Sequence, residues 1–125
     1  MAAKTTTFAD TVLNTYLVTP GAFIALYTAT GEVDTTGTGY ARASVAALTG
    51  FTTPVPVLGV ETTSNVVPVT YLSATLAWGT ITEVHIFDAL TGGNELYSGA
   101  LTASKTVDVG DTVSFAAGAL AIGES

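Results

Sequence analysis

One stretch, Trp78–Gly93, constrains the fold of this chain most, because it joins the clearest strand pattern to a strong turn signal. Residues 80–87 are rich in β-branched and aromatic side chains, which suit a pleated, half-buried strand. The glycines and asparagine of residues 91–94 tolerate positive φ and therefore indicate a turn. We expect a central hairpin whose return strand covers residues 96–101, with Trp78 anchored in the core.

Short apolar or β-branched runs continue on both sides of this hairpin, separated by turn residues about every 10 positions. Further strands are expected at residues 22–28, 40–48 (where the alanines also allow a helix), 51–60, 66–72, 105–109, 112–116 and 119–122, with a loop at 29–39 and a turn at 62–65. Proline cannot donate to a sheet ladder, so Pro54 and Pro56 indicate an edge strand or an irregular crossing at 51–60, and Pro68 indicates an edge strand at 66–72. The pattern predicts an all-β fold with a single antiparallel β-sandwich or jelly-roll-like domain.

Residues 5–17 are the one helix candidate, since apolar side chains recur there at helical spacing. The stripe consists of Phe8, Val12, Leu13, Tyr16 and Leu17. Pro20–Gly21 is expected to end the helix. The alternative is an extended arm, because the run of threonines favours helix poorly. The predicted organisation is an amino-terminal arm or short helix over residues 1–21 and a β-sandwich domain over residues 22–125.

Charged residues are rare in this chain. They make up 10% of it, with a net charge of −7, against roughly 25% charged residues in a typical soluble domain. The three basic residues, Lys4, Arg42 and Lys105, are too few and too scattered to bind phosphates, so nucleic acids and anionic membranes are unexpected partners. No apolar run approaches the ~20 residues of a membrane helix, and the amino terminus lacks the apolar stretch of a secretory signal. Low charge favours a surface covered by partners in an assembly, although a monomer rich in Thr and Ser remains the alternative.

No catalytic or metal-binding signature stands out. The one histidine, His85, shares a strand face with Glu83 and Phe87, but no nucleophile motif accompanies it, so a packing or hydrogen-bonding role is expected. The absence of cysteine excludes disulfides and thiolate metal sites. The loop Asp88–Glu95 offers oxygen ligands of the kind calcium prefers, but turn capping is the favoured interpretation. We predict no enzyme activity, no catalytic residue, no metal and no cofactor.

Short segments spread between about Phe8 and Leu120 occur in a recognisable order. They are Ala25–Thr28, Gly39–Arg42, Thr63–Asn65, Ala77–Thr80, Ile86–Ala89, Thr91–Asn94, Ser98–Leu101, Lys105–Val107, Gly110–Asp111 and Phe115–Leu120. Together they resemble a family of small tailed-bacteriophage virion proteins, often labelled tail fibre or minor tail proteins. The resemblance implies a non-enzymatic structural protein of the phage particle, made in the cytoplasm of the bacterial host.

The place in the particle has to be chosen on other grounds. A receptor-binding fibre generally needs a shaft, and no heptad or repeat that would build one is visible. We therefore expect a capsid decoration (cement) protein on the outer head surface, bound to the major capsid protein or other virion proteins. The alternative is a small tail fibre or tail-tip component.

A chain of this kind is expected to form a homo-oligomer, with a trimer favoured because decoration proteins tend to sit on local three-fold junctions of a capsid lattice. The apolar stripe of the amino-terminal segment must be covered by something. We expect it to contact the capsid or a neighbouring copy through Phe8, Val12, Tyr16 and Leu17. The alternative is that the stripe packs against its own sandwich.

Overall fold

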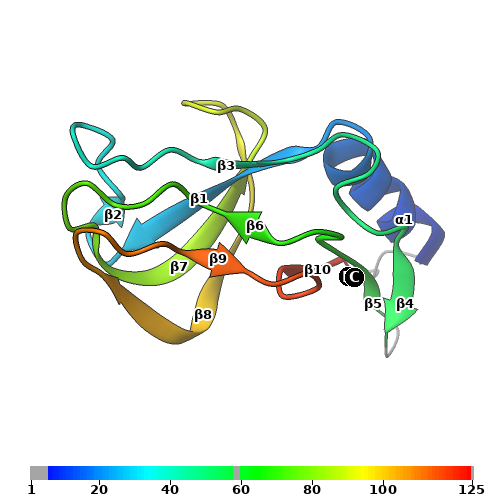
Figure 1. The fold of residues 1–125 in the computed structure, drawn as a ribbon. Coiled ribbons are helices and arrows are strands. Elements are labelled where there is room, and N and C mark those ends of the chain that lie inside the picture. The colour runs from blue at the N-terminus through cyan, green and yellow to red at the C-terminus, as the bar shows by residue number, and fades with distance from the viewer. Residues whose placement is uncertain (1–5, 58–59, 125) are drawn as a thin grey trace. The chain divides into compact units, whose positions relative to one another are not determined.

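The computed structural model describes residues 6–57 and 60–124 (Figure 1). The α-helix α1 (Thr6–Leu13) continues as a π-helix (Asn14–Val18), which confirms the short amino-terminal helix. The described strands are β1 (Ala22–Thr28), β2 (Gly31–Glu32), β3 (Ala43–Val45), β4 (Val55–Val57), β5 (Val60–Ser64), β6 (Val69–Thr70), β7 (Gly79–Phe87), β8 (Glu95–Val107), β9 (Ser114–Phe115) and β10 (Ala121–Glu124). The fold is all-β and sandwich-like, as predicted. No helix of the described residues is long and apolar enough to span a membrane.

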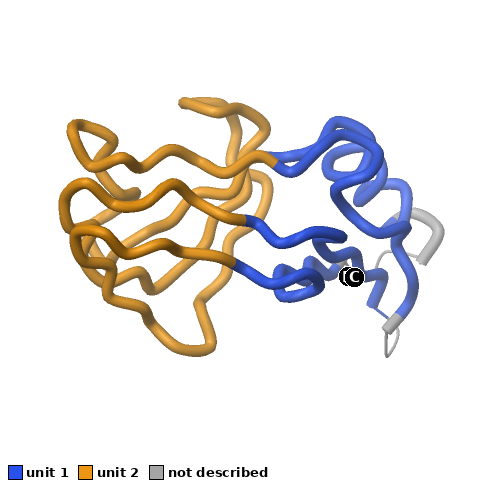
Figure 2. Tube along the Cα trace, viewed as in Figure 1, with its two compact units in different colours: residues 1–22, 45–69, 115–125 blue, residues 23–44, 70–114 orange. Residues whose placement is uncertain are grey.

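The chain divides into two compact units, coloured separately in Figure 2. Unit 1 consists of residues 1–22, 45–69 and 115–125, and unit 2 consists of residues 23–44 and 70–114. Neither unit is continuous in sequence, because the chain passes from one unit to the other at four places.

The main sheet belongs to unit 2 and has the strand order β2–β1–β7–β8, with β3 also paired to β1. The predicted central hairpin is present as the antiparallel pair β7–β8. Strand β8 runs to Val107 without a break, so the prediction of a separate strand at 105–109 was wrong. Two steps along β7, from Ile81 to Glu83, correspond to five steps along β8, from Lys105 to Ala100. The extra residues form a bulge, and a bulge bends its strand and weakens the alternation visible in sequence.

The core of unit 2 is organised around Trp78, which is buried as predicted. Its indole Nε1 donates a hydrogen bond to the carbonyl of Thr38 at 2.8 Å. The rings of Tyr40 and Tyr71 meet it edge to face, with centroids 5.4 and 6.3 Å away. Tyr71 in turn donates its hydroxyl to the carbonyl of Ile24 on β1, 2.7 Å away. The aromatic cluster therefore joins the sheet to the loops around it.

Unit 1 contains a smaller antiparallel sheet of order β10–β5–β4, and α1 packs against β5 and β10. Leu13 and Leu17 of the helical segment are fully buried. The turn predicted at residues 62–65 is wrong, because residues 62–64 belong to β5, the central strand. The β-branched Thr62 and Thr63 suit a strand, and Thr62 pairs with both neighbouring strands. Strand β4, which contains Pro56, lies at the edge of the sheet as predicted.

Gly21 ends the helical segment, as predicted. Its N–H donates to the carbonyl of Leu17 at 2.9 Å, and its φ is +74°. A Cβ at this position would lie 2.4 Å from the carbonyl oxygen of Val45, so only glycine fits.

A buried asparagine, Asn65, connects two loops of unit 1. Its side-chain Nδ2 donates to the carbonyls of Val67 (2.8 Å) and Ala116 (3.0 Å), and its Oδ1 accepts the N–H of Leu120 at 3.0 Å. A buried amide is tolerated when its donors and acceptor are satisfied in this way. Asn65 thereby holds the chain after β5 against the segment that precedes β10.

Candidate functional site

The loop Asp88–Asn94 at the tip of the β7–β8 hairpin is closed by its own first and last residues. The Asp88 carboxylate accepts the backbone N–H of Asn94 at 2.7 Å and its side-chain amide at 3.0 Å. Gly93 has a φ of +75°, and a Cβ there would lie 2.5 Å from the Asp88 carboxylate. The hydrogen bonds from Asn94 lower the pKa of Asp88. The loop is thus a capped turn with one defined shape.

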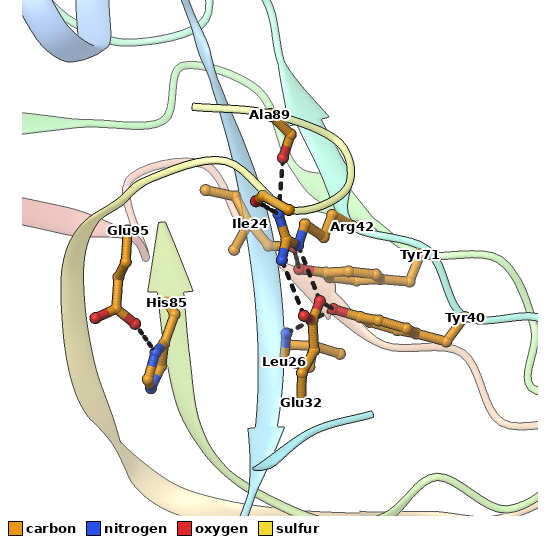
Figure 3. Close-up of polar contacts among 10 residues, drawn as sticks. Ile24, Leu26, Glu32, Tyr40, Arg42, Tyr71, His85, Ala89 and Glu95 are labelled. Atoms are coloured by element: carbon orange, nitrogen blue, oxygen red, sulfur yellow. Dashed lines mark hydrogen bonds and ion pairs between the residues drawn. The ribbon is translucent and has the colours of Figure 1, made fainter. Parts of the chain in front are cut away.

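Arg42, which lies between β2 and β3 in sequence, donates hydrogen bonds to the backbone of this loop (Figure 3). Its Nη1 donates to the carbonyls of Ala89 (2.9 Å) and Gly92 (2.8 Å). Its Nε and Nη2 donate to the two carboxylate oxygens of Glu32, both at 2.9 Å. The guanidinium carbon also lies 3.7 Å from the ring centroid of Phe87. The fixed fork of arginine suits such a bridge, because one planar group reaches a carboxylate and two carbonyls together.

Glu32 receives further support from Tyr40, whose hydroxyl donates to it at 2.8 Å and accepts the N–H of Leu26 at 3.0 Å. Partial burial raises the pKa of Glu32, but hydrogen bonds from Arg42 and Tyr40 and the nearby positive charge outweigh it, so the pKa is lowered overall. The hydrogen bond between Arg42 and Glu32 also raises the pKa of Arg42. Burial raises the pKa of Tyr40, so its hydroxyl stays protonated and acts as a donor. Both charges are therefore held in their ionised forms.

On the face of β7 that also carries Phe87, His85 lies between two glutamates. Its Nε2 is 2.9 Å from Glu83, and its Nδ1 contacts Glu95 on β8. The imidazole stacks on the ring of Tyr27 with centroids 3.6 Å apart. His85 thus connects β7 and β8 through its contacts with the two glutamates.

Comparison with known proteins adds the family. Residues 3–123 match the family described as Podophage GP4 fiber I protein gp80. This chain belongs to that family. A search of curated proteins finds no match.

Membership in the gp80 family confirms the resemblance to small tailed-phage virion proteins. The chain is a phage structural protein, and the family description supports a fibre component better than the capsid decoration protein that we ranked first. A chain without a visible shaft motif can still belong to a fibre, because a fibre can be built from several kinds of subunit.

The four predicted assembly residues of this gp80-family chain lie in different environments. Leu17 is fully buried in unit 1, Val12 is half-buried, and Tyr16 is 54% exposed. The side chain of Phe8 lies outside the described residues. The structure does not test whether any of them contacts a partner, so that contact stays a prediction. Leu17 is already covered by its own unit.

Sequence reasoning missed the role of Arg42 in this family member. Its contacts with residues 89 and 92 join positions 47 and 50 residues apart in sequence, so no local pattern reports them. The available signal was its isolation, since Arg42 is the one basic residue between Lys4 and Lys105. A single arginine in a charge-poor chain is a candidate for a structural ion pair.

The residues proposed as oxygen ligands are engaged in hydrogen bonds. Asp88 binds Asn94, and Glu95 contacts His85. Among residues 6–57 and 60–124, no group of three or more His, Asp or Glu side chains is arranged to hold a metal ion. In the described part of the chain these side chains act as caps and cross-links for the hairpin.

Proposed function

We propose that this chain is a non-enzymatic structural component of a phage fibre, exposed on the surface of the virion. The observation that carries the proposal is the match to the gp80 fibre family over residues 3–123. That match covers nearly all of the chain, so the proposal applies to the whole sequence and not to one segment.

The contacts of the charged side chains support a structural role. Arg42, Glu32 and His85 are used to fix backbone segments relative to each other. A fibre subunit needs a stable shape and loops that keep one conformation, since ordering a loop during binding reduces affinity. The clamped hairpin tip Asp88–Asn94 meets that need.

The proposal is tested by locating and counting the chain in purified virions. Virions that carry an epitope tag on this chain would be labelled with gold-conjugated antibody and imaged, and copies per particle would be counted against the major capsid protein by quantitative mass spectrometry. A fibre component should label the tail or its appendages and be present in few copies.

Two outcomes would contradict the proposal. Gold distributed over the head, with a copy number comparable to that of the capsid protein, would support a decoration protein. Absence of the chain from infectious virions would exclude a structural role. As a matched control, the same tag on the capsid protein should label heads alone.

A further inference from the structure

Unit 1 displays large aliphatic side chains on two adjacent loops. Leu48 is 68% exposed, and Val66 and Val67 are 46% and 60% exposed. We call these three residues the aliphatic surface. Isolated exposed apolar residues are ordinary, but neighbouring ones on fixed loops mark contact sites.

Backbone hydrogen bonds fix the two loops against each other. The N–H of Val66 donates to the carbonyl of Gly50 at 2.8 Å, and the N–H of Gly50 donates to the carbonyl of Ala46 at 3.0 Å. Leu48 lies inside that second turn. On the other side, the Nδ2 of Asn65 holds the carbonyl of Val67. The aliphatic surface is therefore presented by a rigid frame.

Leu48 occupies an unfavourable backbone conformation. Its φ is +67°, and no other described residue except glycine has positive φ. Glycine would adopt this conformation without strain, and asparagine with less strain than leucine. A leucine that is both strained and exposed contributes little to the stability of an isolated chain. Contact with a partner is a better reason for leucine at this position.

The occupant can be argued from charge. Within residues 45–69, the segment of unit 1 that contains the whole aliphatic surface, the one charged residue is Glu61, and it is only 6% exposed. The chain as a whole has a net charge of −7, so two copies repel each other through most of their surfaces. An uncharged region avoids like-charge contacts when it meets its own counterpart, and its apolar side chains gain from leaving water.

We propose that the aliphatic surface Leu48, Val66 and Val67 binds a second copy of this chain. This self-association goes beyond the proposed function, because a fibre component does not in itself require contact through unit 1. Such a contact is compatible with the trimer expected from the sequence and with a two-fold dimer.

The test is sedimentation equilibrium of the full chain and two variants over an about hundredfold range of concentration. The double variant Leu48→Gly with Val67→Thr removes aliphatic surface, while glycine relieves the strain and threonine keeps the β-branched shape. The matched control is Leu72→Ser in unit 2, where Leu72 is 74% exposed. Thermal unfolding of each variant reports whether it folds.

We expect the wild-type chain and Leu72→Ser to associate with increasing concentration and the double variant to remain a monomer at all concentrations. Sodium sulfate should strengthen the wild-type association, since it favours apolar burial. A monomeric wild type, or a folded double variant that associates as strongly as wild type, would overturn the proposal. If the double variant unfolds, Val67→Thr alone decides: unchanged association in that folded variant also overturns it.

Discussion

Each of the two units is stabilised internally by a different kind of interaction. Unit 2 carries seven acids and two basic residues, and its loops are fixed by directional contacts of Arg42 and Trp78. Unit 1 carries three acids and Lys4 as its single basic residue, and its helix and small sheet are held by aliphatic burial and by Asn65. Charge in this protein is concentrated where backbone shape must be specified.

The two units also differ in the kind of surface that they expose. Unit 2 presents a polar hairpin tip that is capped and clamped from outside. Unit 1 presents aliphatic side chains on loops that are bonded to each other. If this account is right, damage to a polar contact should loosen one unit more than the other, and the predictions below test that in order of expected effect.

Trp78→Ala should have the largest effect. Loss of a buried aromatic side chain leaves a cavity, and typically costs about 3–5 kcal/mol. Denaturant unfolding measures the loss, and hydrogen exchange should show faster opening first in unit 2. Trp78→Phe is the control, because it keeps a ring and loses the bond to Thr38. A loss below about 1 kcal/mol in Trp78→Ala would show that the aromatic cluster is not the core of that unit.

Arg42→Gln should destabilise the chain by about 2–4 kcal/mol, because it removes several charge-assisted hydrogen bonds and leaves Glu32 partly buried without its counter-charge. The amide of Asn94 should exchange faster as the hairpin tip loosens.

Arg42→Lys is the informative comparison for that variant. Lysine keeps the charge but cannot form the planar bridge to Glu32, Ala89 and Gly92. If Arg42→Lys retains wild-type protection at the hairpin tip, the clamp depends on charge alone and its geometry is unimportant.

Asn65→Ala should cost about 1–3 kcal/mol, since it leaves the N–H of Leu120 without its partner. Faster exchange is expected in unit 1, in contrast to the Trp78 and Arg42 variants. Asn14→Ala is the matched control, because Asn14 donates one side-chain bond, to the carbonyl of Asp10. If both variants lose the same free energy of unfolding, Asn65 is not the main polar contact of unit 1.

The smallest effect is a pH dependence that comes from Glu32. Its pKa in the folded chain lies below the ordinary value of a glutamate, because Arg42 and Tyr40 donate hydrogen bonds to the carboxylate. A lowered folded pKa stabilises the fold above the unfolded pKa, and the stabilisation is lost as pH falls through the folded value. The stability difference between wild type and Glu32→Gln should therefore shrink as pH falls below about 4.5. Asp34→Asn serves as the control, and a difference that stays constant down to acid unfolding would contradict the lowered pKa.

Features that depend on local sequence were predictable. The short helix, strand β7, the turn at residues 91–94 and the burial of Trp78 all follow from periodicity, β-branching or turn chemistry. The edge position of β4 follows from Pro56 in the same way.

Features that depend on distant partners were not predictable. Thr62 and Thr63 were predicted to lie in a turn, yet both belong to β5, where β10 pairs with both residues and β4 pairs with Thr62. The predicted return strand ended at residue 101 and the next strand began at residue 105, but β8 continues through residues 102–104 and pairs with β7 through a bulge. The positive φ of Leu48 contradicts its residue type, and no sequence rule would place a leucine there.

Unit 1 is discontinuous in sequence and is completed by residues 115–125, which has a consequence for its folding during synthesis. Strand β10 leaves the ribosome after every other described strand, yet it supplies one side of β5 and part of the surface on which α1 rests. While residues 121–124 are still unsynthesised, β5 has an open edge and the helix an incomplete support. A nascent or prematurely terminated chain is therefore recognisable to chaperones and proteases as unfinished. Only chains translated through β10 can complete unit 1.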